Sequence, residues 1–402
     1  MTRNAIYDVA IAGGGPAGTS AAIHLAEQGM SVLLAEQKRF PRPKLCGEFI
    51  SPECINHFER LGVVESILAA KGATLIETSF YSRSGNKVTV PSHWFGTERA
   101  AIGLSRAEMD RLLLERAKRV GVTVLQEAHV VEPILKADRV SGMRLKRNEQ
   151  FEEYRAAITI DATGRTRALA RKLSAKKDRQ RARLVAFKAH LQHAHVAPGV
   201  CEIYSYRRGY GGLSNIEGGL SNLCFIVAAR DVRRYGPVPE EVLKGTVLRN
   251  SRAAVALAEA EFEQPWLSVA LESFGRHQLV PAEGLLLIGD AAAFIDPFTG
   301  SGMLMALESG AVAAQAIIDS RDEISDEGSF PALANRFRAN YASTFNSRLR
   351  VSSWLRRAAF VPRLAEAAII CFGASDRLRR RVAQATRPQL TLKAPVNNPK
   401  SL

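Results

Sequence analysis

The sequence has few cysteines and no long hydrophobic run. Its five cysteines, at Cys46, Cys54, Cys201, Cys224 and Cys371, are spread over 402 residues and form no CxxC pair. A sparse, odd count of this kind is typical of reduced thiols and argues against a disulfide framework. No apolar stretch reaches the ~18 residues that a membrane-spanning helix needs. The short apolar run at the N-terminus leads into glycines rather than a signal-peptide cleavage site, so we expect a cytoplasmic protein.

Acidic residues are outnumbered by basic ones. The 40 Asp and Glu residues stand against 55 Lys and Arg residues, for a net charge of +15. Such a charge favours acidic ligands, an anionic membrane surface or nucleic acid as partners. No nucleic-acid-binding motif accompanies it, so we expect no nucleic-acid partner. The 46% hydrophobic content excludes disorder, and the length allows two domains.

The first motif is the glycine-rich segment 13–18, GGGPAG, with a GxGxxG pattern on Gly13, Gly15 and Gly18. It follows an expected strand, 7–12, and leads into an expected helix, 17–29, which is the context that a dinucleotide-binding turn requires. The glycines allow a tight turn, and the helix N-terminus offers free N–H groups to a pyrophosphate. Glu36 follows the next apolar run, 31–35, where a carboxylate can accept both hydroxyls of an adenosine ribose. The alternative is a glycine-rich turn in an unrelated α/β protein.

The second motif is the segment 289–303, GDAAAFIDPFTGSGM, which follows the apolar run 285–288. Asp290 can accept a hydrogen bond from a polyol, and the loop and the next helix N-terminus can face a phosphate or the O2 side of an isoalloxazine. Both motifs, some 270 residues apart, suit one long ligand such as FAD. The alternative is a loop without a ligand.

The expected fold is α/β, with a discontinuous Rossmann-like FAD-binding domain, an antiparallel substrate-domain sheet and C-terminal helices. Buried-strand patterns at 122–125 and 156–160, and a helix at 104–120 with Ser105 as N-cap and Glu108 three residues later, belong to the first domain. Alternation in 183–270 and a hairpin at 81–90 indicate the second. The boundaries are 1–75, 100–170 and 280–340 for the FAD-binding domain, 76–99 and 171–279 for the substrate domain, 341–390 for the helices and 391–402 for a tail.

The segments GGGPAG, LSRAEMD, DATGR and GDAAAFIDPFTGSGM together resemble the flavoprotein group of para-hydroxybenzoate hydroxylase-type monooxygenases, flavin halogenases and geranylgeranyl reductases. The segments KLCGE at 44–48 and MLMALESG resemble the geranylgeranyl reductase branch most. The resemblance implies that Glu36 binds the adenosine ribose, Arg106 the FAD phosphate or ribityl region, and Asp290 the ribityl chain. The full set of implied FAD contacts is Gly13, Gly15, Pro16, Ala17, Gly18, Glu36, Lys44, Cys46, Gly47, Arg106, Val130, Asp161, Gly164, Gly289, Asp290, Pro297, Gly300, Ser301, Gly302 and Met303.

Two departures from the relatives bear on the reaction. The halogenase segment WxWxIP is missing, because Trp94, Trp266 and Trp354 stand alone. A YxWxFP-like stretch typical of geranylgeranyl reductases is replaced by YRRGYGGL at 206–213. We therefore expect an NAD(P)H-dependent monooxygenase that acts through a flavin C4a-hydroperoxide. The alternatives are reduction of C=C bonds in a prenyl-like lipid and electron transfer without a substrate.

The candidate catalytic residues lie near the expected flavin: Cys46, Pro297 and Gly300. Cys46, beside Lys44 and Arg42, is either a flavin-contacting thiol or proton donor, or a small residue that lines a loop. The substrate is expected to be small and hydrophobic or amphiphilic, in contact with Tyr204, Tyr206, Tyr210 and Phe225. A metal site at His190, His193 and His195 is not expected, because only the last two would share a strand face and no other ligand stands close in sequence.

The segment 348–387 holds ten arginines and two acids, Glu366 and Asp376, among apolar residues. One interpretation is a helical cap whose arginines are solvated. The other adds contact with an anionic membrane through basic amphipathic helices. The sequence does not predict the oligomeric state or distinguish NADH from NADPH.

Overall fold

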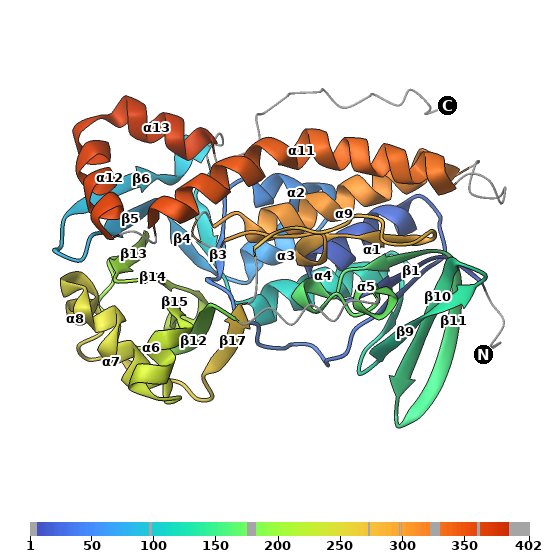
Figure 1. Ribbon diagram of the computed structural model, residues 1–402, viewed down its shortest axis with the longest axis horizontal. Helices are drawn as coiled ribbons and strands as arrows, with labels where there is room; N and C mark the ends of the chain where they lie inside the picture. Colours follow the sequence, from blue (N-terminus) through green and yellow to red (C-terminus); the bar gives the residue numbers. More distant parts are fainter. Residues whose placement is uncertain are drawn as a thin grey trace.

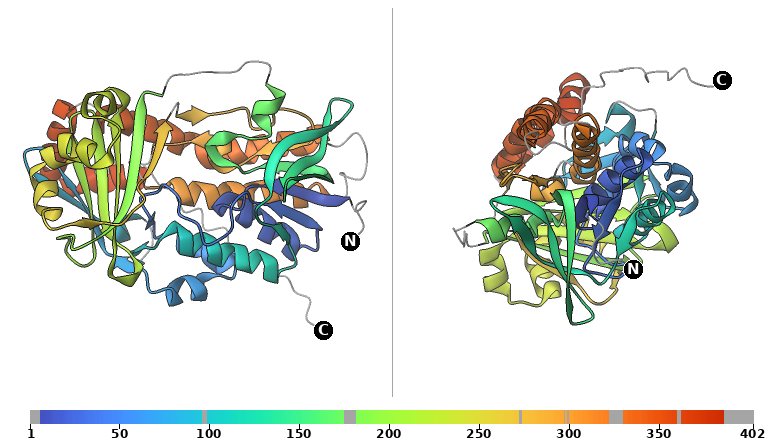
Figure 2. Two further views of the ribbon diagram at one scale, coloured as in Figure 1. Left: turned by 90° about the horizontal axis from the view of Figure 1, so that it is seen from below. Right: turned by 90° about the vertical axis from the view of Figure 1, so that its right-hand side faces the viewer.

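The computed structural model describes residues 6–95, 99–174, 182–271, 274–296, 298, 300–321, 330–359 and 362–385. Two large sheets lie towards opposite ends of the long axis, and a long helix runs across both parts (Figures 1 and 2). The expected α/β architecture is confirmed. We call the sheet whose strand 7–12 precedes the first glycine-rich motif the flavin-side sheet, and the other one the substrate-side sheet.

The flavin-side sheet has seven strands. Its parallel core pairs β8 with β2, β2 with β1, β1 with β11 and β11 with β19. β11 is longer than expected: Ala156–Asp161 joins the core, whereas Gln150–Arg155 continues outwards and pairs with β10. Its strands are β1 (Tyr7–Ala12), β2 (Val32–Ala35), β8 (Thr123–Leu125), β9 (His129–Lys136), β10 (Arg139–Arg147), β11 (Gln150–Asp161) and β19 (Leu285–Leu287).

The helices beside this sheet bring the two glycine-rich motifs together. α1 (Pro16–Glu27) and α9 (Gly302–Ile318) pack so closely that a Cβ on Gly310 would lie 2.4 Å from the Ala17 carbonyl oxygen. Ser20 donates a hydrogen bond of 2.8 Å to the Leu307 carbonyl. A Cβ on Gly289 of the second motif would also lie 2.9 Å from the Ala17 Cβ, so the two motifs meet at the start of α1.

The helix at 104–120 is confirmed as α4 (Arg106–Arg119), and Ser105 caps it by accepting the Glu108 N–H at 3.2 Å. The second hydrogen bond of a capping box, from the Ser105 N–H to the Glu108 side chain, is not formed. The Ser105 N–H donates to Glu217 at 2.8 Å, and Glu108 binds Arg111 instead. Shorter helices α2 (Cys54–Arg60), α3 (Val64–Ala69) and α5 (Ala170–Leu173) complete this part.

The substrate-side sheet has eight strands, all antiparallel to their neighbours except β13 and β5, which pair in parallel. One face is covered by α6 (Ala229–Tyr235), α7 (Pro239–Gly245) and α8 (Ser251–Ala256). The strands are β5 (Glu77–Tyr81), β6 (Lys87–Pro91), β12 (Leu184–Gln192), β13 (Val200–Tyr206), β14 (Gly209–Asn215), β15 (Ser221–Ala228), β16 (Glu261–Phe262) and β17 (Leu267–Leu271).

Small elements join the two parts. β3 (Phe49–Ile50) and β4 (Ala73–Leu75) both pair with β7 (Ala101–Gly103), and β18 (Gly275–Arg276) pairs with β20 (Ala293–Phe294). Residues 40–52 are largely irregular and include β3 near their end.

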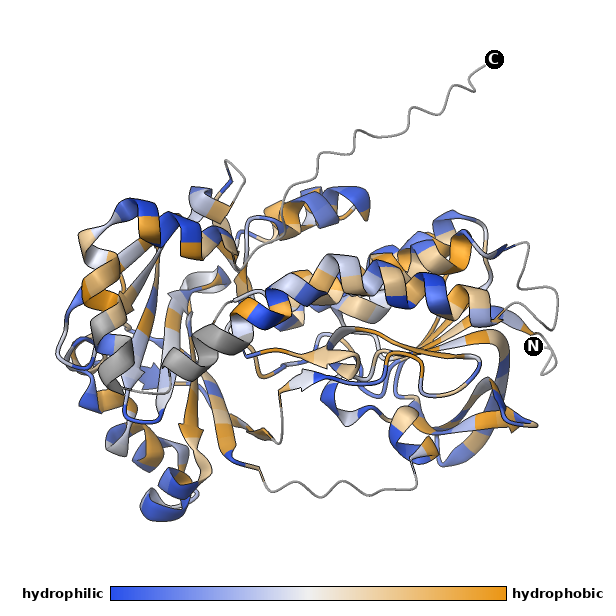
Figure 3. Cartoon of the chain, turned by 45° about the horizontal axis from the view of Figure 1, so that its top comes forward, coloured by the Kyte–Doolittle hydropathy of each residue, from blue (hydrophilic) through white to orange (hydrophobic). Residues whose placement is uncertain are grey.

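The C-terminal helices form a roof over both parts of the protein. α11 (Phe330–Ala359) packs on α9, whereas α12 (Pro362–Ala374) and α13 (Asp376–Ala385) pack on β6 and the 3₁₀ turn Ser92–Phe95 of the substrate-side part. α13 is mainly hydrophilic in Figure 3. Arg348 on α11 is buried and binds Glu308 at 2.6 Å, so it is not a solvated arginine.

Candidate functional site

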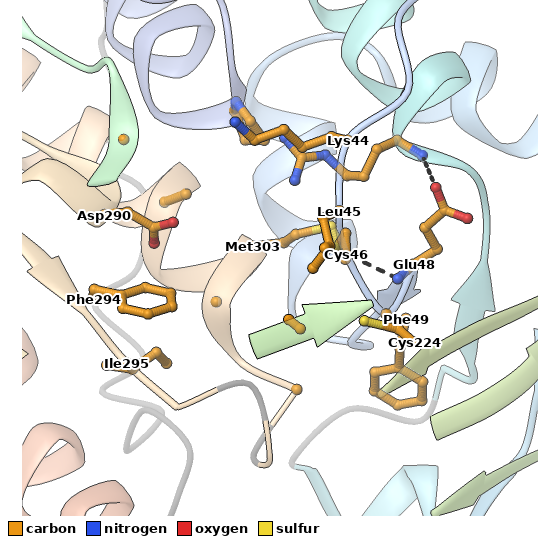
Figure 4. A pocket seen from close by; sticks show the side chains of 18 of the residues that line it. Lys44, Leu45, Cys46, Glu48, Phe49, Cys224, Asp290, Phe294, Ile295 and Met303 are labelled. Carbon is orange, nitrogen blue, oxygen red and sulfur yellow. Dashed lines mark hydrogen bonds between the residues drawn. The ribbon is translucent and has the colours of Figure 1, made fainter. Parts of the chain in front are cut away.

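A cavity of about 770 Å³ lies between the two sheets and is the candidate site. Its volume falls within the range of ligand pockets. The segment from Lys44 to Phe49 faces Asp290, Phe294 and Ile295 across it, with Met303 between them (Figure 4). Both glycine-rich motifs, the cavity face of the substrate-side sheet, and α12 and α13 all contribute to its lining.

The glycines of the first turn have two different roles: Gly13 and Gly18 allow the tight turn, and Gly15 leaves its backbone open to the cavity. A Cβ on Gly13, whose φ is +106°, would lie 2.4 Å from the Ala162 carbonyl oxygen, and one on Gly18 would lie 1.9 Å from the Gly13 carbonyl oxygen. Gly13 and Gly18 are therefore glycines because the turn is tight, and Gly18 does not line the cavity. Around Gly15 the nearest atom to such a Cβ is Arg106 Nη2, at 4.0 Å. The backbone at Gly15, followed by Pro16 and Ala17, is thus open to a ligand.

Glu36 follows β2 and is buried, with 5% exposure. Its carboxylate accepts the Gly14 N–H and the Lys38 N–H, both at 2.9 Å, so the two backbone segments fix its position. Because Glu36 also lines the cavity, it can accept hydroxyl donors from a ligand beside the glycine turn.

Five cations line the flavin side of the cavity: Lys38, Arg42, Lys44, Arg106 and Arg165. Asp110, which is fully buried, accepts two hydrogen bonds from Arg106, at 2.9 and 2.8 Å. Burial alone would lower the pKa of Arg106, but Asp110 and the neighbouring Cys46 raise it above its ordinary value. Burial, Arg106 and Arg42 lower the pKa of Lys44. This excess of positive charge suits a pyrophosphate.

Arg42 supplies an unsatisfied group within this cation set. Its Nη1 lies 3.3 Å from Asp110 Oδ2, yet it is buried without a hydrogen bond to the described residues. A buried donor left in this state destabilises the protein by about 1–3 kcal/mol. A ligand with oxygen acceptors in the cavity would remove that penalty.

The second glycine-rich segment holds Asp290 beside the cations. Burial raises the pKa of the Asp290 carboxyl, and Arg165, Lys44 and Arg106 oppose that rise. Gly289, Gly300, Gly302 and Met303 line the cavity, and Gly300 has a φ of +62°. Ser301, by contrast, is buried at the start of α9 and does not line the cavity. Pro297 lies outside the described residues.

Val130 and Gly164 line the cavity, but the placement of Asp161 corrects its expected role. Asp161 is fully buried and away from the cavity lining. Its carboxylate accepts the Thr163 N–H at 3.1 Å, the Thr163 hydroxyl at 2.6 Å, and the Leu169 and Ala170 N–H groups at 3.0 and 3.1 Å. All its acceptor capacity shapes the turn that carries Gly164, so Asp161 positions the site rather than binding the ligand.

Cys46 lies at the junction of the two sides, beside Lys44 and Gly47 in the cavity lining. Its Sγ accepts the Glu48 N–H at 3.4 Å, and its carbonyl accepts a hydrogen bond from Asn222 of β15 at 3.2 Å (Figure 4 shows the first contact). The thiol is therefore held in a fixed place by both parts of the protein.

Glu48 is a cavity residue that the sequence analysis did not identify. It is 1% exposed and binds Lys188 Nζ, the His190 Nε2 atom at 2.7 Å and the Arg106 N–H at 2.9 Å. Although burial would raise the pKa of Glu48, the His190 hydrogen bond and the charge of Lys188 lower it overall. Lys188 and His190 belong to β12, so their bonds to Glu48 connect the segment 44–48 to the substrate-side sheet.

The side chains of His190, His193 and His195 do not form a cluster. β12 ends at Gln192, so His193 and His195 do not share a strand face as expected. His190 binds Glu48, and His195 lies 3.2 Å from Glu259. Within the described ranges no group of three or more His, Cys, Asp and Glu side chains could hold a metal ion.

Three of the four expected substrate contacts are corrected. Tyr204, Tyr206 and Phe225 are buried under α6–α8, on the face of the sheet away from the cavity. Only Tyr210 lines the cavity. Alternate residues of a strand face opposite sides, so the cavity receives the neighbouring set instead: Ile203, Ser205, Gly212, Ser214, Cys224 and Ile226.

Residues 6–320 match the family described as FAD binding domain. The chain belongs to that family. This flavoprotein is 28% identical over 321 residues to a digeranylgeranylglycerophospholipid reductase of Methanosarcina acetivorans, with 78% of this chain and 76% of the relative covered. A flavin-dependent brominase has the same fold, with a TM-score of 0.79 and 22% identity over 95% of this chain and 94% of the other. A geranylgeranyl bacteriochlorophyll reductase-like protein of Thermoplasma acidophilum gives a TM-score of 0.74 and 21% identity over 94% and 92%.

The resemblance stated from the motifs is thus confirmed, and the protein is an FAD-dependent oxidoreductase. The residues present fit FAD. The open backbone at Gly15, the fixed carboxylate of Glu36 and the incompletely bonded Arg42 meet the needs of its pyrophosphate and ribose. Arg165 and Arg42 were not among the expected contacts. Arg165 stands in the DATGR segment, so that motif already carried the signal for it.

Proposed function

We propose that the protein reduces C=C bonds of a lipid-like, prenyl-containing substrate, with reduced FAD as the hydride source. The observation that carries the proposal is the apolar part of the cavity, which adjoins the flavin side at Cys46. Its walls come from β5, β6, β13–β15 and α12, and include Phe80, Val88, Val90, Ile203 and Ile369. A site that holds a hydrocarbon chain needs such walls.

Reduction of a C=C bond adds one hydride and one proton. The Cys46 thiol is the group from this chain that we assign to the proton, because it lines the cavity between the cation set and the apolar walls. Two electrons and one proton per bond must come from an outside donor, for which NAD(P)H is our proposal, and the second proton comes from water, which reprotonates the Cys46 thiolate. The similarity to digeranylgeranylglycerophospholipid reductases supports this reaction over the hydroxylation that we expected from the sequence.

Hydroxylation remains the second candidate. It is supported by the shared fold of a flavin-dependent brominase, which concerns architecture alone at 22% identity. The two reactions differ in their need for oxygen, because only hydroxylation incorporates an oxygen atom into the product.

The test is a single turnover without oxygen. The flavoprotein is reduced anaerobically with dithionite and mixed with a prenyl-chain lipid, and flavin absorbance and product mass are measured. We expect the flavin to reoxidise and the lipid to gain two hydrogens per reduced bond. A flavin that stays reduced until oxygen is admitted, followed by a product that contains oxygen, would replace the reductase proposal with hydroxylation.

A matched pair of cysteine variants tests the role of Cys46. Cys46→Ala should slow lipid reduction by about 10²- to 10⁴-fold while FAD binding is kept, because a general acid contributes about that much. Cys371→Ala, on the exposed part of α12, should react like the natural protein. Equal rates in all three proteins would remove Cys46 from the reaction.

A further inference from the structure

The charges of the cavity are distributed unevenly. The flavin side contributes both acids and bases: Glu36, Glu48 and Asp290 beside the five cations. Among the described residues that line the substrate side, Arg379 on α13 is the only charged one. The cavity there is otherwise made of apolar, glycine and hydroxyl-bearing residues, so this arginine stands out chemically.

Several contacts hold Arg379 in place. Its guanidinium lies over the ring of Trp94, 5.2 Å from the centroid, and its Nη2 donates to Asp376 at 2.6 Å. The Arg379 side chain is 17% exposed, whereas that of Asp376 is 76% exposed. Because water screens the carboxylate so strongly, the ion pair neutralises the buried part of the guanidinium only weakly.

The guanidinium also has a donor to spare. Arg379 Nε is buried and has no hydrogen-bond partner among the described residues. A buried donor without an acceptor destabilises a protein by about 1–3 kcal/mol. A bound ligand that supplied an oxygen acceptor to this donor would remove that cost. A guanidinium binds planar oxyanions with two parallel hydrogen bonds.

The other residues that line the cavity from α13 and from the elements packed against it are apolar, among them Val90 of β6, Phe95 of the 3₁₀ turn, Phe372 of α12, and Val382 and Ala383 of α13. A head group bound by Arg379 would therefore be followed at once by hydrocarbon walls. This arrangement matches an amphiphile with one acidic end and an apolar chain that extends towards the flavin side.

We propose that Arg379 forms an oxyanion subsite that binds the acidic head group, a carboxylate or a phosphate, of the amphiphilic substrate. This inference rests on the proposed function, because it takes the bound molecule to be the substrate. It assigns to α13 the selection of substrates by head group, which the flavin-side residues do not provide.

The experiment is calorimetric binding to the oxidised, FAD-loaded protein, without turnover. Three ligands share one saturated alkyl chain and differ in the head group: carboxylate, phosphate monoester and alcohol. The proteins are the natural chain, Arg379→Met, Arg379→Lys and, as a control, Arg380→Met on the exposed side of the same helix.

We expect Arg379→Met to weaken the binding of an acidic ligand by about 10- to 100-fold, as for hydrogen bonds to charged groups, and to leave the alcohol unchanged. Arg379→Lys should recover part of the affinity, and Arg380→Met should bind like the natural protein. The stronger of the two acidic ligands then tells whether the subsite suits a carboxylate or a phosphate.

Two other outcomes separate this inference from the proposed function. If the alcohol binds as well as the acids, and Arg379→Met changes neither, the oxyanion subsite is wrong while a lipid-like substrate still stands. If none of the three alkyl ligands binds the natural protein, both proposals fall. An equal loss in Arg379→Met and Arg380→Met would indicate general surface charge and would overturn the subsite.

Discussion

The two sides of the cavity differ in how they are built. The flavin side is made of short segments in which the functional residues stand next to each other in sequence, as in 13–18, 44–48 and 289–303. The substrate side is assembled from single residues on several strands and helices, from Thr78 to Ala383. A pattern search therefore finds the first side and misses the second.

The difference has a physical origin. A glycine turn works through its own backbone: Gly18 must be glycine because the Gly13 carbonyl lies 1.9 Å from where its Cβ would be, and this constraint is local. A cavity wall in a sheet depends on which face of each strand points inwards. That choice is made by packing against α6–α8, which are remote from the strand residues they cover.

The largest effect is expected where the two sides are joined, at Glu48. Glu48→Gln leaves Lys188 buried without its anionic partner, so we expect a loss of about 3–5 kcal/mol in the free energy of unfolding at neutral pH. The fold holds the pKa of Glu48 below its ordinary 4.5. The stabilisation is therefore present above that pH and is lost as the pH falls through the folded-state pKa.

Chemical unfolding of the natural protein and the variant at about pH 7 and at about pH 4 measures this difference. Glu283→Gln is the control, because its ion pair with Arg139 is long, at 3.8 Å, and partly exposed. A Glu48→Gln variant within about 1 kcal/mol of that control would show that the junction is not held by this charge pair.

The next effect concerns the flavin side alone. Gly15→Val fills the open space beside the turn, so we expect FAD affinity to fall by ~10²-fold or more, since charge-assisted hydrogen bonds to the pyrophosphate are lost. The φ of Gly15 is −77°, so the fold should survive. Flavin absorbance after gel filtration and circular dichroism measure both properties.

Gly18→Val provides the contrast, because its side chain would overlap the Gly13 carbonyl and should prevent folding. A folded Gly15→Val protein that keeps its full yellow colour would show that the pyrophosphate does not approach the backbone at Gly15.

A smaller effect distinguishes the two faces of the substrate-side sheet. Burial raises the pKa of both Tyr204 and Tyr210, so both hydroxyls remain donors. A neighbouring carboxylate raises the pKa further in each case, Glu202 for Tyr204 and Asp296 for Tyr210. Tyr204→Phe loses its bond to Glu202, and we expect about 1 kcal/mol of lost stability with unchanged kcat/KM.

Tyr210→Phe should instead change kcat/KM by about fivefold, because the lost donor held Asp296 beside the cavity-lining Ile295. Steady-state kinetics with a prenyl-chain lipid, together with thermal unfolding, compare the two variants. If Tyr204→Phe altered kcat/KM more than Tyr210→Phe, the assignment of the cavity face would be reversed.

The sequence predicted most of the fold and much of the flavin side. The turn at 13–18, the position of Glu36, the helix cap at Ser105 and the second glycine segment could each be read from neighbouring residues. Asp161 was correctly placed beside the turn at Gly164, but it was expected to bind the ligand. Its hydrogen bonds from Leu169 and Ala170, which fix that turn instead, depend on how the chain folds back.

The substrate side could not be predicted in the same way. Tyrosines and phenylalanines were chosen by type, and three of them proved to be core residues, because aromatic side chains serve both cores and pockets. Glu48 and Lys188 are 140 residues apart in sequence, so only tertiary structure brings them together. The roof of α12 and α13 depends likewise on long-range packing.

The smallest effect concerns the outer face of the roof, where membrane contact remains a proposal. The structure reduces the set of arginines that could serve it. Arg348 is paired inside, Arg379 lines the cavity, and the side chains of Arg356 and Arg357 lie outside the described part. In the described residues no helix is long and apolar enough to cross a membrane. Among the described side chains of the segment 348–385, the exposed arginines are Arg350 on α11 and Arg377, Arg380 and Arg381 on α13.

Each basic residue near an anionic surface contributes about 1 kcal/mol, so the three exposed arginines of α13 predict weak binding that salt abolishes, as the Debye length falls to about 3 Å in 1 M salt. Co-sedimentation with anionic and neutral vesicles at low and high salt measures it. The triple variant Arg377→Glu, Arg380→Glu and Arg381→Glu should stay in solution under all conditions. Since the same helix carries Arg379 on its inner side, a protein that pellets with anionic vesicles would take an acidic amphiphile from the surface on which α13 rests. If the natural protein does not pellet at low salt, the outer arginines serve solvation alone and the substrate must arrive by another route.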